Sequence, residues 1–581
     1  MQVLFVFLDS DRRNLYQLRQ WIQPLQRLGR THEVSVLYSD EMAAADLQKA
    51  GLVSHRVNVG DGLVDFLNAH QPKLLLYPNQ NTLNFFANRY SSGVHAWVSH
   101  GESDKAYMSQ NTLKRYDLYF AAGPVAKQRV LQSVSGFSPD RIKLIGRPQL
   151  TDTHSVPDDF TPQAGTSLQV LYAPTWEGAT PATQYCSVET HGVTIVQRLI
   201  ELGHRIIYRP HPLSGTRDQG VAAADAEIRR TIGLANRQLD QNHYIDSSEF
   251  GWQLEQLDFL ITDISAVAYD WLATGKPLLI TKPEHPEATL PNAPLFSALE
   301  LLGSQDVVNL ESSIDSARAS IGSKDSRLAH VRAEYFATQE ADQLFRVAVD
   351  EALGLQEKMS FERGAAAKPL QRFARREAWL RSLLRYPSFA LRMLLKVLGI
   401  WATVGENPPT RLGKPLRNLY VHFSDAFDVR SLAAVARELF EIAKTDGEVH
   451  VATNQATTFA ALKAHFWWHG RFIGSTKPQI HLHANISAAD GEVLLNRLSP
   501  ERVLYLKDHP NNLMLLRLNG TKHFLYRPES DPGFEPTHSL TMYDAVVTNS
   551  TDTQAAVRSI LAISRPALQK FGSPDASLDL T

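Results

Sequence analysis

The chain has 581 residues, more than one hydrophobic core can serve, because single cores stop growing at roughly 250 to 300 residues and longer chains divide into domains. Apolar residues make up 43% and charged residues 21%, which excludes a disordered chain, while a formal net charge of −2 excludes a global field that attracts nucleic acid. The single cysteine, Cys186, excludes an internal disulfide and fits a reducing cytoplasm. We therefore expect three folded cytoplasmic domains with no nucleic-acid partner.

The first apolar run, from Val3 to Leu8, reads as a buried strand rather than a signal peptide because no basic region precedes it. Residues 1–150 continue with short apolar runs that alternate with amphipathic stretches such as "NLYQLRQWIQPLQRLG". This alternation is typical of βαβ units and predicts a doubly wound, Rossmann-like domain.

A polar turn, "WVSHGESDKAY", follows the run "HAWVS". A neutral histidine beside carboxylates that hold its tautomer suits a general base, so we expect His100 to be catalytic, with a hydrogen-bonded structural histidine as the alternative. The other charged residues of the turn are expected on the acceptor side: Glu102, Asp104 and Lys105.

A Pro-, Asp- and Thr-rich linker at 151–166 precedes a second βαβ series at 167–355, which we expect to bind the nucleotide donor. Its last helix is expected to pack back across the first domain. Two such domains enclose a cleft at the carboxyl ends of their strands, where these sheets bind nucleotides.

Two strand ends of the second series carry polar and aromatic residues. In "HRIIYRPHP", Arg209 and His211 supply a planar fork and a second donor for a diphosphate, the alternative being a capping arginine and a surface histidine. In "VLYAPTWEG", Thr175 is expected to bond a phosphate and Trp176 to floor the pocket, although a tryptophan at a strand end also fits a plain core position.

A third strand end, in "LDFLITDISAVAYDWLATGKPLLI", places Asp263 before a helix that starts near Ser265. Free backbone N–H groups at a helix start form an anion site, and Asp270 on the same helix is expected to reach a ribose hydroxyl or orient a donor. The alternatives are a plain N-cap for Ser265 and a solvated side chain for Asp270.

A basic amphipathic connector occupies 360–410, and its segment 363–396 interleaves nine Lys or Arg with Trp, Phe and Leu. Such a segment fits either an inner-membrane surface or a connecting helix packed on the domains. The apolar stretch 389–405 is interrupted by Arg392 and Lys396, so no transmembrane helix is predicted.

Residues 415–581 repeat the pattern of the first domain. "NLYVHFSDAF" matches "VLFVFLDSDR", and "YDAVVTNS" matches "YDLYFAAG", in the same order along the chain. The second turn, "LYRPESDPGFE", has Arg527 and Pro528 where the first has His-Gly. We expect a degenerate third α/β domain that keeps the scaffold and has lost the chemistry.

In this order, "SHGESDK", "IGRPQLTD", "LYAPTWEG", "YRPHP" and "ITDISAVAYDWLATGKPLLI" resemble the CDP-glycerol glycerophosphotransferase family, the teichoic acid primases and polymerases. The resemblance implies a GT-B-like pair of α/β domains with a CDP-alditol in the cleft. It makes His100 the proposed base, Arg209 and His211 diphosphate contacts, and Ser265 and Asp270 donor-site residues.

The implied reaction transfers an alditol phosphate from a CDP-alditol to a hydroxyl of a polyol-phosphate, glycan or lipid-linked acceptor in a cell wall or capsule, releasing CMP. It implies no cofactor and no metal. The family's basic segments suggest the inner face of the membrane. The alternatives are a GT-B glycosyltransferase or epimerase that uses a UDP-sugar, and a binding scaffold.

Overall fold

In the computed structural model, residues 1–363 are described apart from short gaps, and beyond them mainly the strands of a third sheet. The connector from residue 364 onward and the second turn at 527–529 lie outside the described residues. The described residues are 1–104, 106–152, 154–161, 167–178, 181–239, 241–320, 327–336, 340–363, 416, 418–423, 439, 448–453, 479–483, 494–495, 498–506, 508–509, 512–516, 521–526 and 538–547.

The first domain is built on a seven-stranded parallel sheet in the order β3-β2-β1-β4-β5-β6-β7, with helices packed around it. The order reverses between β1 and β4, so the loops after these two strands diverge and open a crevice at the carboxyl edge. The strands are β1 (Val3–Phe7), β2 (Val34–Tyr38), β3 (Ser54–Arg56), β4 (Leu74–Tyr77), β5 (Val94–Trp97), β6 (Leu118–Ala121) and β7 (Ile142–Leu144). The helices are α1 (Leu15–Leu28), α2 (Met42–Lys49), α3 (Asp61–His70), α4 (Asn84–Tyr90) and α5 (Pro124–Ser133), with the 3₁₀ turns η3 (Asn111–Arg115) and η5 (Pro148–Thr151).

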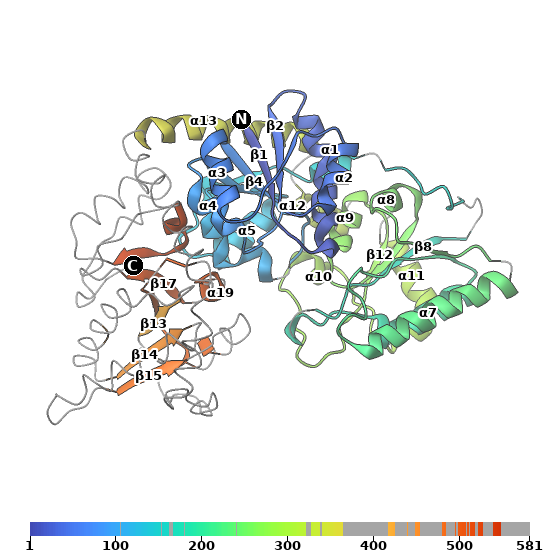
Figure 1. Cartoon of the computed structure of the whole chain (residues 1–581). Helices are drawn as coiled ribbons and strands as arrows, with labels where there is room; N and C mark the ends of the chain where they lie inside the picture. Colours follow the sequence, from blue (N-terminus) through green and yellow to red (C-terminus); the bar gives the residue numbers. More distant parts are fainter. Residues whose placement is uncertain are drawn as a thin grey trace, which may run out of the picture.

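The second domain has a five-stranded parallel sheet in the order β10-β9-β8-β11-β12 and lies beside the first (Figure 1). Its strands are almost wholly buried, as expected for a parallel sheet covered on both faces. The strands are β8 (Gln169–Ala173), β9 (Arg205–Tyr208), β10 (Tyr244–Ile245), β11 (Phe259–Thr262) and β12 (Leu278–Ile280). The helices are α6 (Val193–Glu201), α7 (Gln219–Gln238), α8 (Trp252–Gln256), α9 (Ala266–Thr274), α10 (Pro294–Ala298), α11 (Leu310–Ala319) and α12 (Arg327–Tyr335).

The long helix α13 (Ala341–Arg363) follows the second domain and crosses back over the first, as its sequence predicts (Figure 1). Phe345 and Val349 belong to the apolar core that lies under α1, and the rings of Phe345 and Trp21 are 5.4 Å apart. The two domains are therefore tied by a shared core as well as by the chain. No helix within the described residues combines the length and the apolar character that crossing a bilayer requires.

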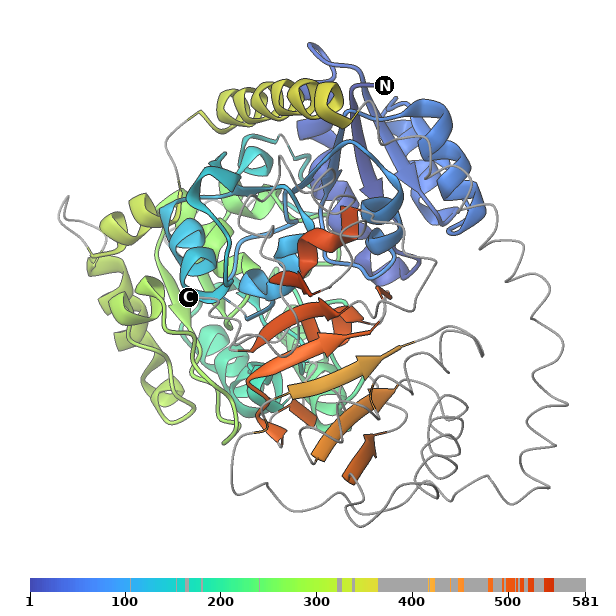
Figure 2. The same ribbon diagram turned by 90° about the vertical axis from the view of Figure 1, so that its left-hand side faces the viewer.

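The third sheet has the order β15-β14-β13-β16-β17-β18, which repeats the first six strands of the first domain (Figure 2). This topology confirms the repeat predicted from the sequence. The strands are β13 (Asn418–His422), β14 (Glu448–Thr453), β15 (Gln479–His483), β16 (Arg502–Tyr505), β17 (Lys522–Tyr526) and β18 (Ala545–Val547), with α19 (Leu513–Leu516) and η10 (His538–Met542).

A buried polar chain recurs in both copies. In the first domain the Tyr77 hydroxyl lies 2.8 Å from Nδ1 of His95, and the His95 backbone N–H donates to Asp117 at 2.9 Å. The copy makes both contacts, at 2.9 Å and 2.7 Å, between the corresponding residues Tyr505, His523 and Asp544. Retention of a satisfied buried network indicates that the copy kept the packing of the original.

The first and third domains meet through equivalent elements. The turn η3 packs on η10, α4 packs on η10, and α19 packs on η3, which is the reciprocity of a two-fold contact. Phe85 of α4 is fully buried among core residues of the third domain. Lys114 is also buried, and its ammonium lies 2.5 Å from the carboxylate of Asp544. The third domain thus supplies the counter-ion of a buried lysine in the first.

Candidate active site between the first two domains

A cleft of about 750 Å³ separates the carboxyl edges of the first two sheets. Loops of both domains line it, which is the usual position of ligand sites in this class of fold. Seven of the residues singled out from the sequence lie in its walls: His100, Thr175, Trp176, Arg209, His211, Ser265 and Asp270.

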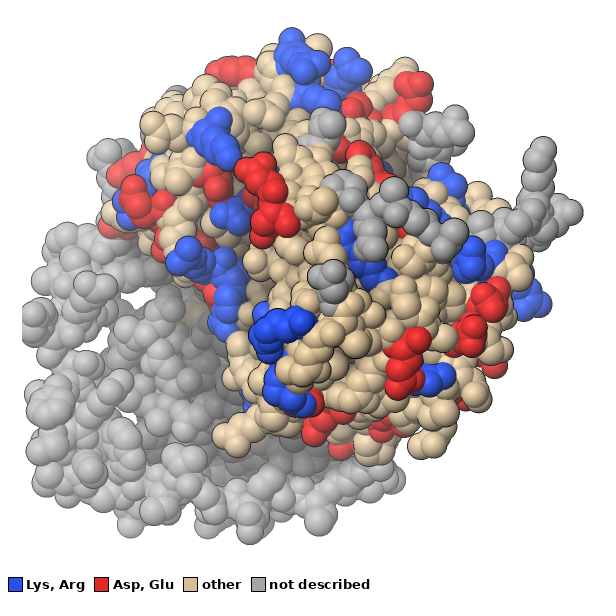
Figure 3. All heavy atoms as spheres, turned by 90° about the vertical axis from the view of Figure 1, so that its right-hand side faces the viewer, with Lys and Arg blue, Asp and Glu red and all other residues tan. Residues whose placement is uncertain are grey.

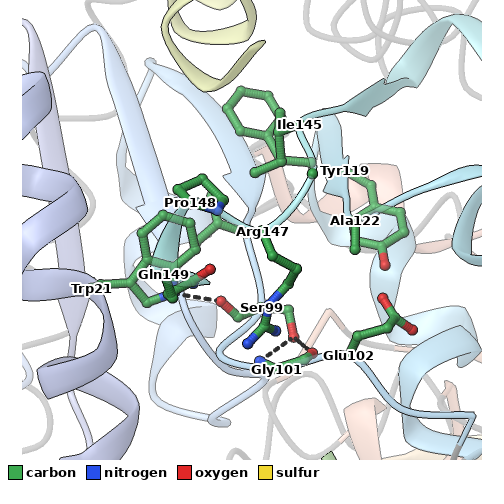
Figure 4. A pocket seen from close by; sticks show the side chains of 13 residues that line it. Trp21, Ser99, Gly101, Glu102, Tyr119, Ala122, Ile145, Arg147, Pro148 and Gln149 are labelled. Carbon is green, nitrogen blue, oxygen red and sulfur yellow. Dashed lines mark hydrogen bonds between the residues drawn. The ribbon is translucent and has the colours of Figure 1, made fainter. Parts of the chain in front are cut away.

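The turn after β5 that carries His100 is held in a strained conformation. Ser99 has φ 58°, in the left-handed region that residues other than glycine rarely adopt. The indole N–H of Trp21 donates to the Ser99 carbonyl at 2.6 Å, and the Ser99 hydroxyl donates to the Gly101 carbonyl at 2.8 Å (Figure 4). These bonds fix the direction in which the next side chain leaves the backbone.

His100 is half-buried, and its Nδ1 lies 3.0 Å from the backbone carbonyl of Pro78. A carbonyl only accepts, so Nδ1 carries the proton and Nε2 of the neutral ring carries the lone pair. The ring of Tyr16 meets the imidazole edge-on at 5.7 Å. The tautomer that suits a base is therefore set by a backbone carbonyl and not, as expected, by the neighbouring carboxylates.

Glu102 and Asp104 correct the acceptor-side expectation, because neither lines the cleft. Both are buried, 2% and 8% exposed, and both pair with the guanidinium of Arg129 from α5. Asp104 also accepts hydrogen bonds from the hydroxyls of Tyr269 at 2.6 Å and Tyr335 at 2.5 Å, both in the second domain. Burial raises the pKa of Glu102, and the Arg129 charge opposes the rise. Asp104 therefore ties the two domains together, while Glu102 pairs with Arg129 inside the first domain.

Lys105, the third acceptor-side candidate, lies outside the described residues.

His211 and its neighbours form the wall that follows β9. Nδ1 of His211 accepts the Leu213 N–H at 3.1 Å, so the ring proton of the neutral form is on Nε2. The rings of His211 and Trp176 are nearly parallel, with centroids 6.3 Å apart. Arg209 lines the same wall while its Nη1 pairs with Asp246 at 2.7 Å. In the neutral rings, Nε2 of His211 is therefore a hydrogen-bond donor, and Nε2 of His100 is an acceptor.

Asp263 departs from its expected role, since it is fully buried and does not line the cleft. Its carboxylate accepts the backbone N–H groups of Thr175 at 2.7 Å and Ser187 at 3.1 Å, and the hydroxyl of Thr281 at 2.5 Å. Burial raises its pKa to about 6, although these donors oppose the rise. Asp263 therefore positions the loops of Thr175 and Ser187 from behind the cleft wall.

The helix α9 starts at the cleft with Ser265 in extended conformation at its N-cap. The Ser265 hydroxyl makes no capping bond to the helix and lies 3.2 Å from that of Thr262. A plain N-cap would bond the N–H two or three residues on. The observed geometry favours the expected anion site, because the dipole and first N–H groups of α9 face the cleft uncapped by this side chain.

Asp270 and Arg147 join the two domains inside the cleft. Nη2 of Arg147, from the loop before η5, lies 2.7 Å from the Asp270 carboxylate of α9, and both side chains are buried. Arg147 reaches toward Ser99 and Gly101 beneath the histidine turn (Figure 4), where a cavity of about 10 Å³ has room for about one water. Asp270 was expected to reach a ribose hydroxyl or to orient a donor, and it pairs with Arg147 instead. Burial raises the pKa of Asp270, and the charge of Arg147 opposes that rise.

Arg147 was not predicted as a site residue, although it lies in the motif "IGRPQLTD" that carries part of the family resemblance. The first-domain wall was also not predicted, and it comes from the start of α1, the loop after β4, the 3₁₀ turn Ala106–Ser109 and η5. One sequence feature indicates this wall: the polar cluster "YPNQN", which begins at the last residue of the buried strand β4. The lining residues there are mainly amides and tyrosines: Asn14, Tyr16, Gln17, Gln20, Asn79, Gln80, Tyr107 and Gln149.

Within the described part of the chain, no group of three or more His, Cys, Asp or Glu side chains is arranged to hold a metal ion.

Two facing Rossmann-like domains with this cleft define a GT-B-like protein. Residues 98–287 match the family described as CDP-Glycerol:Poly(glycerophosphate) glycerophosphotransferase, which confirms the resemblance seen in the sequence. The match covers the histidine turn, the Arg209 loop and α9, and it indicates a glycerophosphotransferase enzyme.

Solved structures with similar folds include enzymes of two kinds. The UDP-GlcNAc 2-epimerase from Neisseria meningitidis is 12% identical with a TM-score of 0.41, covering 61% of this chain and 100% of that one. The wall teichoic acid polymerase TagF is 12% identical with a TM-score of 0.39, covering 61% and 90%. S. aureus MnaA with UDP is 13% identical with a TM-score of 0.39, covering 61% and 97%. The comparison with curated proteins gave no match.

Proposed function

We propose that the enzyme transfers an alditol phosphate, glycerol phosphate in the simplest case, from a CDP-alditol to a hydroxyl of a cell-wall, capsular or lipid-linked acceptor and releases CMP. The observation that carries the proposal is the pair of opposite tautomers in one cleft. Nδ1 of His100 faces a carbonyl, which puts the lone pair of its neutral ring at Nε2, whereas Nδ1 of His211 accepts an N–H, which puts its proton at Nε2. Hydroxyl attack on a diphosphate needs both, a base for the nucleophile and a donor for the phosphate oxygens.

In the proposed first step, Nε2 of His100 takes the proton of the acceptor hydroxyl, whose oxygen attacks the distal phosphorus of the donor. The Pro78 carbonyl supports this role because it stabilises the imidazolium that forms as the proton arrives. The bond between the distal phosphorus and the bridging oxygen breaks, and CMP carries away that oxygen and its charge.

The developing charge would be met on the second-domain wall. His211, Arg209 and Thr175 line the cleft there together with the start of α9 at Ser265. Fixed donors aimed at the position of developing charge are the main source of catalysis in such transfers. Trp176, stacked with His211, gives the cytosine or ribose a flat surface.

The same proposal locates the enzyme in the cytoplasm at the inner face of the membrane. Its support is the basic amphipathic segment 363–396 together with the family resemblance.

The test of the reaction is CMP release from CDP-glycerol and CDP-ribitol, with UDP-sugars as competing donors and a lipid or oligosaccharide acceptor present. We expect His100→Ala to lower turnover by about 10² to 10⁴-fold, the usual worth of a general base, with little change in donor KM. The matched control is His70→Ala, an exposed histidine at the end of α3, which should leave the rate unchanged.

A His100→Ala protein that keeps most of its rate would remove His100 from the mechanism. Silence with every CDP-alditol, together with turnover of a UDP-sugar, would replace the proposed reaction by that of a GT-B glycosyltransferase or epimerase.

A further inference from the structure

We infer that the acceptor is a neutral glycan, bound by the amides and tyrosines of the first domain, and not a polyanionic polyol-phosphate chain. The inference rests on the proposed function, since it concerns the acceptor of that reaction. Four features of the first-domain wall carry it.

The wall beside His100 is a built amide network. The Asn79 side-chain amide donates to Oε1 of Gln17 at 2.8 Å, and the Asn84 amide donates to the Asn79 backbone carbonyl at 2.9 Å. The Gln80 amide donates to the backbone carbonyl of Tyr107 at 2.8 Å. An amide both donates and accepts, as a sugar hydroxyl does, so an ordered row of amides matches a ligand rich in hydroxyls.

Two further amide side chains of this wall have an oxygen without a hydrogen-bond partner among the described residues. These atoms, Oε1 of Gln20 and Oε1 of Gln149, are buried. Both residues line the cleft. A buried acceptor without a partner destabilises the protein, and a ligand hydroxyl can donate to it, whereas a phosphodiester oxygen, itself an acceptor, cannot. The unsatisfied groups therefore favour a hydroxyl-bearing ligand.

Aromatic side chains flank the proposed base. Tyr16 meets the imidazole of His100 at a centroid distance of 5.7 Å, and Tyr107 lines the cleft from the loop that follows the histidine turn. Burial raises the pKa of both hydroxyls, so both stay protonated and neutral at physiological pH. Neutral rings with a polar tip suit the mixed apolar and polar faces of a pyranose.

The positive charges of this wall are already matched. Arg19 pairs with Asp46 at 2.8 Å and approaches Glu249 at 3.8 Å. Arg147 pairs with Asp270 at 2.7 Å. The lining of the cleft contains no lysine within the described residues. A phosphodiester chain needs cations to offset its desolvation, and here each first-domain arginine in the lining has a carboxylate partner.

The surface charge on the side of the second domain also gives no support for a polyanionic acceptor. Figure 3 views the molecule from the side of the second domain and shows basic and acidic side chains interspersed over the described surface. A polyanion that met this face would encounter both signs of charge and gain little steering.

The test compares octyl glycosides of glucose, galactose and N-acetylglucosamine with a glycerol phosphate trimer as acceptors for CDP-glycerol. We expect at least one glycoside to raise CMP release about tenfold over the reaction without acceptor, with a KM that is insensitive to salt between about 50 mM and about 500 mM. A trimer that is the better acceptor, with a KM that rises steeply with salt, would overturn the inference.

Acceptor binding is measured separately from the reaction by saturation-transfer NMR, which needs no donor. Glycoside signals that are lost in Gln20→Ala and Gln149→Ala support the inference, even for a protein that does not turn over CDP-glycerol. Binding of the trimer alone, or of neither ligand, contradicts it. Failure of the proposed function shows instead as absent binding and turnover of every CDP-alditol while glycoside binding persists.

The same two substitutions should change the KM for the acceptor and leave the KM for the donor unchanged. Each is expected to raise the glycoside KM by about tenfold, the worth of one lost hydrogen bond, with the KM for CDP-glycerol unchanged within about twofold. Gln48→Ala, at an exposed position on α2, is the matched control and should change neither. Equal effects on both constants would assign Gln20 and Gln149 to general packing and remove them from acceptor binding.

Discussion

Ser99 shows how a residue without chemistry of its own directs the proposed base. Its left-handed backbone turns the chain so that His100 enters the cleft, and the bonds from Trp21 and to Gly101 hold that turn. A non-glycine residue in a sparsely populated region costs about 1 to 3 kcal/mol, which the surrounding contacts must offset. The strained residue directly precedes His100, so its conformation sets the direction in which the imidazole leaves the backbone.

We expect Ser99→Gly to keep turnover within about tenfold, because glycine adopts this backbone without strain. Ser99→Val should lower kcat by about 10²-fold or more with little change in donor KM, because a β-branched residue resists the left-handed region and reorients His100. The measurement is steady-state CMP release by both variants.

Gln71, with φ 42° at the end of α3, offers the control. Gln71→Val imposes the same backbone conflict far from the cleft and should lower the thermal midpoint while leaving kcat intact. If Ser99→Val changed only the thermal midpoint, the turn would have no directing role.

Residues at strand ends were predictable, but the direction of their side chains was not. Polar residues that follow apolar runs mark the carboxyl edge of a parallel sheet, so Thr175, His211 and Ser265 were found at the cleft. The same rule selected Asp263, whose side chain turns inward to meet backbone N–H groups of loops far away in the sequence. No local pattern encodes such a partner.

Among the elements, α9 combines several contacts along little more than two turns. Its N-terminus faces the proposed diphosphate position, Tyr269 donates to Asp104, and Asp270 pairs with Arg147. Both partners belong to the first domain and flank the histidine turn. A shift of α9 relative to the first domain would therefore move the donor site and the proposed base together.

The pair Arg147 and Asp270 allows this coupling to be measured. Arg147→Leu and Asp270→Leu should each lower the free energy of unfolding by about 3 to 5 kcal/mol, because each leaves a buried charge without its partner. The double variant should recover part of that loss yet stay inactive, since the cleft loses its bridge. Urea unfolding and CMP release measure the two effects.

An exposed pair provides the comparison. Arg198 and Glu201 lie 2.5 Å apart on α6 with side chains 34% and 59% exposed. Their cycle should give a coupling of about 0.2 to 1 kcal/mol. Additive losses at Arg147 and Asp270 would mean that the two charges are not energetically coupled.

The elements themselves followed from hydrophobic periodicity, whereas the contacts between them did not. Buried runs alternating with amphipathic segments predicted parallel sheets in a doubly wound arrangement, and the repeat predicted the order of the third sheet. The pairing of Glu102 and Asp104 with Arg129 was missed because the interpretation assumed that charges in a turn face solvent or substrate. Buried ion pairs give no periodic signal.

At the scale of the whole molecule, the third domain occupies the face of the first domain that a second copy would match. Equivalent elements meet across the contact, with η3 on η10 and α4 and α19 in reciprocal positions. Lys114 and Phe85 are buried there, one against Asp544 and one in the third-domain core. The contact resembles the interface of a symmetric dimer within one chain.

This geometry predicts the behaviour of the chain after deletion of 415–581. The face of α4 and η3 that the third domain covers includes the buried Phe85 and Lys114 and meets equivalent elements of the copy, so we expect the truncated protein to form a homodimer through it, detected as a doubled mass in sedimentation equilibrium. Phe85→Asp in the truncated chain should restore the monomer, while Val53→Asp, at a residue 59% exposed elsewhere in the first domain, should not.

Activity after the deletion then decides what the domain contributes. If the third domain holds a partner or a long acceptor, the truncated enzyme should retain CDP-glycerol turnover on short acceptors and lose its ability to bind or extend long ones. Unchanged product length and acceptor affinity would leave the domain a structural cover for the face around Lys114. A truncated protein that stays monomeric, or that aggregates without forming a defined dimer, would show instead that the repeat in sequence does not extend to a symmetric association surface.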